Sequence, residues 1–120
     1  TSEAIKKRTS ELIQESAELI NYRLDEQILI ECYDVYHNEY GMITEAGEQA
    51  ISDCANLEGI LLDPIYTGKV MAGLIDLVDK EVIDKNIPVI FIHTGGMPII
   101  FSYENELSKQ INCKKIYPTK

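Results

Sequence analysis

The chain has 120 residues, enough for one domain, and its 45% hydrophobic and 26% charged residues are typical of a globular protein rather than a disordered one. Its formal net charge of −9 repels phosphate backbones and anionic membrane surfaces, which argues against nucleic acid or a membrane as a partner. No apolar run approaches the roughly 20 residues that a membrane-spanning helix needs.

The first part of the chain is predicted to contain a helix, a strand and another helix. Residues 3–21 place apolar side chains at helical spacing, whereas residues 27–32 form a short apolar run with β-branched side chains, which favours a buried strand. Residues 33–42 have no regular pattern. Thr44 is expected to cap a helix that continues through residue 56.

The second part of the chain continues this alternation. Residues 60–62 are predicted to form a strand, and residues 67–82 carry apolar side chains along one side of a helix. Residues 89–92 are uninterrupted apolar sequence, the pattern of a parallel strand that is covered on both faces. A last helix is expected over residues 103–111.

The predicted order α, β, α, β, α, β, α indicates an α/β fold, a three-layer αβα arrangement with parallel strands joined by right-handed crossovers. A sheet of so few strands is thin and leaves an edge unpaired, so we interpret the chain as part of a larger sheet. Residues 1–112 are assigned to this partial domain and residues 113–120 to a tail.

The cysteines and the first residue bear on compartment and processing. Cys32, Cys54 and Cys113 are odd in number and widely spaced, so neither a disulfide framework nor a metal site is expected, and a reducing cytoplasm is the expected location. The chain begins at Thr1 without a basic or apolar leader, which favours a processed or excised fragment over a chain that carries a signal peptide.

Ligands in open α/β sheets gather at the carboxyl ends of the strands, here residues 33–41, 63–68 and 93–96. Tyr66 and Thr67 follow one predicted strand and set a phenol and a hydroxyl at a helix start, where backbone N–H groups can admit a ligand. A capping threonine and a tyrosine with its hydroxyl in water would explain the same pattern, and both interpretations remain open.

The other polar residues near these strand ends give weaker signals. The turn of residues 94–96, Thr-Gly-Gly, resembles one that accommodates an anion or a ring, but glycine pairs often serve backbone geometry alone. His93 is expected to be a hydrogen-bonded structural residue, and His37 has no identifiable partner, so neither is assigned to catalysis. Lys69 is expected to reach solvent or a carboxylate, whereas Gly73 suggests close helix packing.

Two stretches carry a family resemblance: LEGILLDPIYTGKVMAGLIDLV at residues 57–78 and FIHTGG at residues 91–96. They resemble the C-terminal part of the D-cysteine desulfhydrases and of the related 1-aminocyclopropane-1-carboxylate deaminases. The likeness extends to residues 39–41 and covers nearly the whole chain except the tail. It implies a pyridoxal 5'-phosphate enzyme of fold-type II, the tryptophan synthase beta-like fold, in which two αβα domains enclose the cofactor and this chain is part of the large one.

The resemblance also implies roles for individual residues. Tyr40 and Tyr66 resemble the two catalytic tyrosines that bind the substrate and handle protons. Thr67 resembles the partner of the pyridine nitrogen, and Thr94 resembles a residue on the same side of the ring, with Gly95 allowing close approach. These residues are the expected catalytic and cofactor-binding set.

The identities of two of these residues bear on the substrate. The deaminases place Glu and Leu where this chain has Thr67 and Thr94, whereas the desulfhydrases place hydroxyl residues there. A hydroxyl can donate to a neutral ring nitrogen, a weaker electron sink that still suffices to expel a thiolate. The expected reaction is β-elimination of D-cysteine to pyruvate, ammonia and hydrogen sulfide, with deamination of the cyclopropane substrate as the alternative.

Other parts of the family pattern precede the region that this chain resembles, including the cofactor lysine and the Gly/Ser/Thr-rich phosphate loop. We therefore expect the parent protein to be a homodimeric lyase acting on a small amino acid, and these residues alone to hold the cofactor poorly and to be inactive. The alternative from another class is a half-domain that binds a partner and has no chemistry of its own.

Overall fold

The computed structural model describes residues 1–24, 28–34 and 40–108, and its contacts divide the chain into two compact units, residues 1–35 and 36–120. Several predictions fall outside the described residues: the start of the first strand, the placement of His37, the end of the last helix, the thiol of Cys113, and the boundary between the partial domain and the tail. These stay predictions.

The first unit contains α1, Ser2–Leu19, which confirms the helix predicted for residues 3–21. Its end is set by Asn21, which adopts a positive φ of 52° that stops helical hydrogen bonding. Ala17 is the buried residue of α1, so most of this helix faces solvent. Of the helices that the structure describes, none is both long and apolar enough to cross a membrane.

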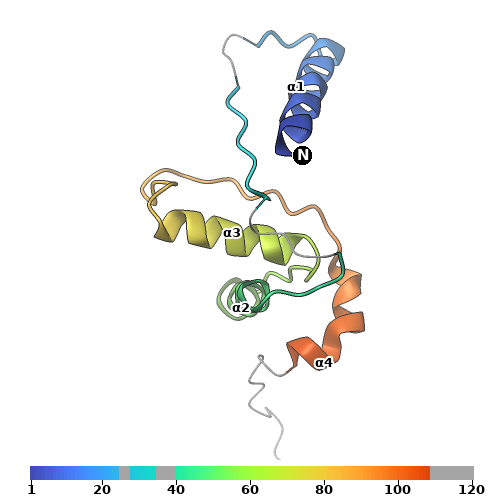
Figure 1. Cartoon of the computed structure of the whole chain (residues 1–120), viewed down its shortest axis with the longest axis vertical. Coiled ribbons are helices and arrows are strands. Elements are labelled where there is room, and N and C mark those ends of the chain that lie inside the picture. Colours follow the sequence, from blue (N-terminus) through green and yellow to red (C-terminus); the bar gives the residue numbers. More distant parts are fainter. Residues whose placement is uncertain (25–27, 35–39, 109–120) are drawn as a thin grey trace, which may run out of the picture. The chain divides into compact units, whose positions relative to one another are not determined.

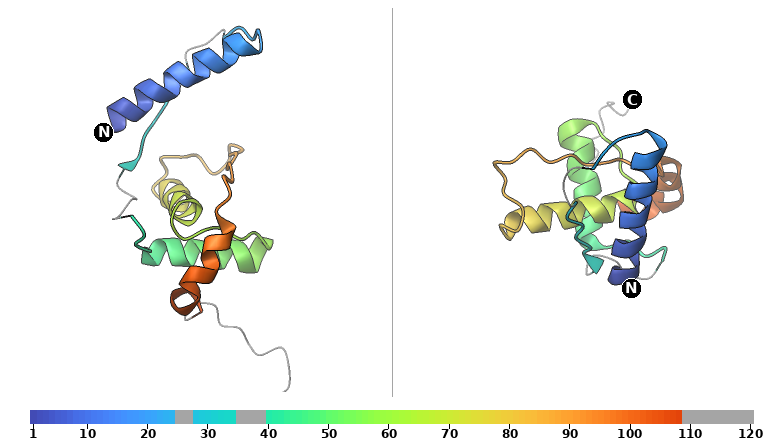
Figure 2. Two further views of the ribbon diagram at one scale, coloured as in Figure 1. Left: turned by 90° about the vertical axis from the view of Figure 1, so that its right-hand side faces the viewer. Right: turned by 90° about the horizontal axis from the view of Figure 1, so that it is seen from above.

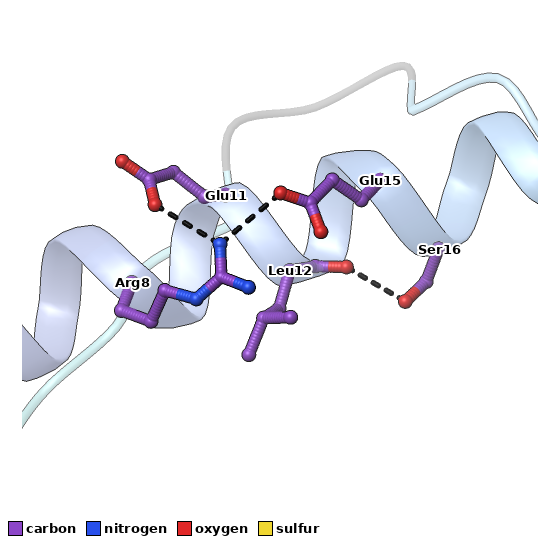
Figure 3. A network of polar contacts seen from close by, with 5 residues as sticks. All are labelled: Arg8, Glu11, Leu12, Glu15 and Ser16. Carbon is purple, nitrogen blue, oxygen red and sulfur yellow. Dashed lines mark hydrogen bonds and ion pairs between the residues drawn. The ribbon is translucent and has the colours of Figure 1, made fainter.

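Charged side chains stabilise the exposed side of α1 (Figure 3). Arg8 Nη1 donates to Glu11 Oε2 at 3.2 Å and to Glu15 Oε1 at 3.1 Å. These hydrogen bonds raise the pKa of Arg8, which is charged at every pH of interest. Ser16 Oγ donates to the carbonyl oxygen of Leu12 at 2.7 Å, so its hydroxyl is satisfied within the helix.

The second unit begins its regular structure at α2, Glu45–Asp53, which continues into a π-helical turn, η2, Cys54–Glu58. Thr44 is the N-cap as predicted, and its Oγ1 accepts from the backbone N–H of Gly47 at 3.0 Å. The turn ends at Gly59, whose φ of 69° is a left-handed conformation that favours glycine. The helix predicted to run through residue 56 is therefore confirmed.

The longest helix that the structure describes in this unit is α3, Thr67–Asp79, which begins at the residue predicted. Figure 1 shows α3 along its length with α2 nearly end-on, and Figure 2 shows the reverse, so the two helices cross steeply. The crossing is close at Gly68, where an added Cβ would lie 2.8 Å from Ile51 Cγ1. Gly73 is buried on the same helix, in keeping with the close packing expected of it.

The last helical segments are η3, a 3-10 helix at Met97–Tyr103, and α4, Glu104–Leu107. Sequence analysis predicts a helix over residues 103–111, and α4 confirms its start. The 3-10 helix was not predicted. Pro98 lies in its first turn, where a residue without an N–H is tolerated because that donor has no partner within the helix.

A small apolar core joins these elements. Ile51 of α2, Leu62 and Leu107 of α4 are 3%, 0% and 4% exposed, respectively. Partly buried residues pack around them: Cys54, Met71, Phe91, Ile100 and Tyr103. The core therefore draws on the segments before and after α3 as well as on the helices, which fixes the loops that carry the candidate site.

The predicted strands are not confirmed, because none of residues 28–32, 60–62 and 89–92 is a strand in the structure. Leu29 and Ile90 are 82% and 89% exposed, so at these two positions the apolar pattern does not reflect burial, whereas Leu62 is buried. A strand is held by hydrogen bonds to neighbouring strands, and short apolar segments without such neighbours stay irregular. The three-layer αβα arrangement with parallel strands is accordingly not confirmed by the described residues.

Candidate functional site

Two exposed phenols from separate segments meet at the start of α3. Tyr66 Oη donates to Tyr40 Oη at 3.3 Å, and the ring centroids lie 6.3 Å apart with the planes inclined by 58°. The residues are 55% and 82% exposed, respectively, so both rings are open to a ligand. The structure thus brings together the two tyrosines that sequence analysis selects.

The hydrogen bond between the phenols gives their two hydroxyl protons different roles. Because Tyr66 donates to Tyr40, its protonated form is favoured, and this bond, with smaller contributions from desolvation and from the charge of Asp63, raises the pKa of Tyr66. Tyr66 therefore keeps its proton at neutral pH. The hydroxyl proton of Tyr40 is left to face solvent or a ligand.

Asp63 organises the backbone that carries Tyr66. Its side chain is 0% exposed, and its two carboxylate oxygens accept hydrogen bonds from the start of α3. Oδ1 accepts from the N–H groups of Ile65 at 2.9 Å and Tyr66 at 2.7 Å. Oδ2 accepts from the N–H of Thr67 at 2.8 Å and from its hydroxyl at 2.5 Å. The carboxylate is fully satisfied by neighbouring donors.

Thr67 turns its hydroxyl toward Asp63 rather than toward solvent. Thr67 Oγ1 donates to Asp63 Oδ2 and accepts from the backbone N–H of Asp63 at 2.8 Å, and the residue is 2% exposed. The hydroxyl therefore both donates and accepts a hydrogen bond within the turn. Thr67 is the first residue of α3 and not its N-cap, so the simple capping interpretation does not describe it.

The ionisation of Asp63 reflects these contacts. Burial alone would raise the pKa of this carboxyl group, but the hydrogen bonds from Thr67, Tyr66 and Ile65 together lower the pKa below its ordinary value of 3.8. Asp63 is thus a buried carboxylate, ionised at neutral pH, whose charge is stabilised by hydrogen-bond donors.

The turn of residues 93–96 is joined to the segment before Asp63. The N–H of Gly95 donates to His93 Nδ1 at 3.0 Å, so the proton of the neutral ring is on Nε2, which donates to the carbonyl oxygen of Leu61 at 2.9 Å. This is the structural role expected for His93. Its two bonds hold the turn against the chain that leads to α3.

Gly96 brings the same turn against Asp63. A Cβ at Gly96 would lie 2.9 Å from Asp63 Cγ, closer than real side chains approach, and its φ is +89°. Both features require glycine. Gly95 also has a positive φ of +95°, with open space around it. Thr94 is exposed, and within the described part of the chain the structure gives it no hydrogen bond to either phenol.

Tyr103 positions the segment that carries Tyr40. Its hydroxyl donates to the carbonyl oxygen of Gly41 at 2.8 Å, and its ring packs on the core. Sequence analysis selects neither this residue nor Asp63 nor Gly96. An aspartate two to four residues before a helix start was the available signal for Asp63, because such side chains commonly bond nearby N–H groups.

Lys69 is more covered than its place in the first turn of α3 suggests. It is 8% exposed, and the expectation that its ammonium group reaches solvent or a carboxylate stays a prediction. The reason for the burial is the steep crossing of the two helices: a Cβ placed at Gly47 of α2 would lie 3.8 Å from Lys69 Cγ. The aliphatic stem of Lys69 is therefore covered by α2.

The described residues fit the implied pyridoxal phosphate only in part. The open phenol pair suits a flat ligand, but the N–H groups at the start of α3 bond Asp63 and are not free to hold a phosphate, contrary to expectation. The hydroxyl of Thr67 likewise has no proton to spare for a ring nitrogen. These groups do not fit the cofactor as the structure places them.

D-cysteine desulfhydrases are among the known proteins that this chain resembles. The chain is 50% identical over 70 residues to a D-cysteine desulfhydrase of Salmonella typhi, a match covering 58% of this chain and 21% of the relative. D-cysteine desulfhydrases of Salmonella newport (strain SL254) and Salmonella heidelberg (strain SL476) are 49% identical over the same shares. No model of a known protein family matches the chain.

The resemblance to D-cysteine desulfhydrases is thereby confirmed over 58% of the chain, less than the nearly whole chain expected from the sequence. The match lies in the C-terminal part of the relatives. The chain spans 21% of their length, about a fifth. The chain is thus similar to a portion of an enzyme.

Proposed function

We propose that this chain is a portion of a pyridoxal phosphate-dependent lyase that converts D-cysteine and water to pyruvate, ammonia and hydrogen sulfide. The similarity to D-cysteine desulfhydrases at half identity supports the reaction class. The proposed parent has the αβα architecture of fold-type II, whose sheet would provide the neighbours that the apolar segments 60–62 and 89–92 need in order to form strands.

The observation that carries the proposal is the pair of exposed phenols. Tyr66 Oη donates to Tyr40 Oη, so the pair retains one outward phenolic proton and presents two aromatic faces to a ligand. Such a pair can bind the polar groups of an amino acid and can pass a proton along the Tyr66–Tyr40 hydrogen bond. In the proposed enzyme, this is the contribution of the chain to substrate binding and proton handling.

The cofactor itself is proposed from the resemblance, and its contacts are not assigned to the start of α3. The N–H groups there and the Thr67 hydroxyl bond Asp63, so the ring nitrogen and the phosphate would be held by other residues. Thr94 and Gly95 remain proposed neighbours of the ring. We accordingly propose that these 120 residues alone retain the cofactor poorly and do not catalyse the reaction.

The test is an assay of the natural gene product that contains this chain. With D-cysteine, release of sulfide and pyruvate is expected, and Tyr40→Phe and Tyr66→Phe should each lower kcat by about 10²-fold or more, the usual contribution of a proton-transfer group. Tyr22→Phe, which removes a hydroxyl from a 64% exposed tyrosine elsewhere, is the matched control and should leave kcat unchanged.

Two outcomes would contradict this proposal. Faster formation of ketobutyrate from 1-aminocyclopropane-1-carboxylate than of sulfide from D-cysteine would assign the deaminase reaction instead. A natural product no longer than this chain that binds a partner and consumes neither substrate would assign a binding half-domain. The expected homodimer and the reducing cytoplasm are tested by sedimentation of the same product and by its location in fractionated cells.

A further inference from the structure

We propose that Asp63 is a positioning residue of this site, whose buried carboxylate holds the start of α3 and the turn of residues 94–96 in one arrangement. The inference rests on the proposed function for its catalytic consequence. It assigns Thr67 to the same positioning unit rather than to direct contact with the cofactor.

The carboxylate of Asp63 fixes the direction in which α3 begins. It accepts from three successive backbone N–H groups, those of Ile65, Tyr66 and Thr67, at 2.9, 2.7 and 2.8 Å. Its backbone carbonyl oxygen accepts from the N–H of Gly68 at 2.8 Å. With side chain and main chain both engaged, the residues from 63 to 68 form one hydrogen-bonded turn.

Thr67 closes this turn from the other side. Its hydroxyl donates to Asp63 Oδ2 while accepting from the Asp63 N–H, so the two residues are joined through side chain and backbone together. A valine at this position would have the same shape but could neither donate nor accept these hydrogen bonds. If Thr67 donated its hydroxyl proton to a ligand, its bond to a buried charge would be broken, which is costly because the charge is left with fewer donors.

Gly96 extends the arrangement to the second loop. The Cα of Gly96 lies so close to the Asp63 carboxyl group that a Cβ would be 2.9 Å from Asp63 Cγ and 3.0 Å from Oδ2. A displacement of the Asp63 side chain must therefore also change the position of the turn that carries Thr94. Asp63 is the common contact of both loops.

The functional consequence concerns the phenols. Because the N–H of Tyr66 bonds Asp63 Oδ1, the position of the Tyr66 backbone depends on the carboxylate, and the Tyr66 hydroxyl meets Tyr40 only when that backbone is correctly placed. Loss of the carboxylate should separate the rings without removing any group that touches a ligand.

The structural test uses the 120-residue chain and the variants Asp63→Asn, Thr67→Val and Thr67→Ser. Asp63→Asn and Thr67→Val should increase amide hydrogen exchange at residues 65–67 by about tenfold or more and weaken the nuclear Overhauser contact between the Tyr40 and Tyr66 rings. Thr67→Ser keeps both functions of the hydroxyl and should preserve wild-type exchange. If Asp63→Asn does not fold, the pair Thr67→Val and Thr67→Ser still decides the question.

Asp84→Asn is the matched control, because Asp84 Oδ1 also accepts a backbone N–H, that of Asn86 at 2.9 Å, beyond the other end of α3. It should leave exchange at residues 65–67 and the ring contact unchanged. Unchanged exchange in both Asp63→Asn and Thr67→Val would overturn the proposal.

A kinetic test in the complete enzyme separates positioning from direct contact. Positioning predicts that Thr67→Val lowers kcat for D-cysteine more than it alters KM, together with faster exchange at Ile65 and Tyr66. Direct contact predicts an altered cofactor absorption spectrum with wild-type exchange at those amides, and that result would overturn the assignment. If the wild-type enzyme does not consume D-cysteine, the proposed function fails, whereas the exchange experiment still decides the role of Asp63.

Discussion

The hydroxyl of Tyr103 donates to the carbonyl oxygen of Gly41 across 2.8 Å, which ties η3 to the residue that follows Tyr40. The ring of Tyr103 also packs on the apolar core. The position of one exposed phenol therefore depends on a residue far along the chain.

Tyr103→Phe should lower the free energy of unfolding by about 1 kcal/mol, because the core packing is kept while the Gly41 carbonyl oxygen loses its donor. Urea denaturation measures this change, and the ring contact of Tyr40 with Tyr66 should weaken in parallel. Tyr22→Phe removes an exposed hydroxyl and should leave the unfolding midpoint in place. Equal midpoints for Tyr103→Phe and wild type would contradict the role given to this hydrogen bond.

Asp63 should make the chain sensitive to acid. Its pKa is lower in the folded chain than the ordinary value of 3.8, so the unfolded state binds more protons in this range. The stabilisation is present above the unfolded pKa and is lost as the pH falls through the folded value. Urea titrations from roughly pH 5 to pH 2 should therefore show a smaller loss of stability for Asp63→Asn than for wild type. If the stability of Asp63→Asn fell with decreasing pH as steeply as that of the control variant Asp84→Asn, the role given to the Asp63 carboxylate would be contradicted.

Gly68→Ala should destabilise the chain by about 1–3 kcal/mol, the usual cost of overpacking. Its Cβ would lie 2.8 Å from the Asp63 carbonyl oxygen and 2.8 Å from Ile51 Cγ1, and backbone cannot give way cheaply. Thermal and urea unfolding measure the loss. Val70→Ala, at a 60% exposed position of the same helix, is the comparison and should change stability by less than about 0.5 kcal/mol. A harmless Gly68→Ala would show that α2 and α3 are further apart.

The neutral His93 ring should carry its proton on Nε2, because Nδ1 accepts from the Gly95 N–H while Nε2 donates to the Leu61 carbonyl oxygen. Nitrogen-15 chemical shifts of the imidazole ring distinguish this tautomer from the other. His93→Ala should accelerate amide exchange at Gly95. A ring found with its proton on Nδ1 would be inconsistent with the turn described for residues 93–96.

The helices could be predicted because their signals are local. Apolar spacing at residues 3–21 and a capping threonine at residue 44 depend on neighbours within one or two turns, and α1 and α2 follow them. The start of α3 at Thr67 was likewise predicted, since the sequence after Pro64 becomes helical in period.

The predicted strands could not be judged from their own residues, because strand formation depends on partners elsewhere. Ile90 is 89% exposed although its segment reads as a buried strand. For the site, the meeting of Tyr40 and Tyr66 could be anticipated from the resemblance. The inward direction of the Thr67 hydroxyl could not be anticipated, because it is set by the buried carboxylate of Asp63. That carboxylate is itself packed against Gly96, which lies in a different loop.

The contact between Gly96 and the Asp63 carboxyl group has a consequence for protein engineering. A larger residue at position 96 would meet the Asp63 carboxyl group and would also be strained by the φ of +89°; a shorter residue at position 63 would relieve only the contact, and that shortening would release the start of α3. Libraries that vary one loop at a time would discard such combinations. Redesign of these two loops therefore requires that both are diversified simultaneously, because substitutions at residues in contact are not additive.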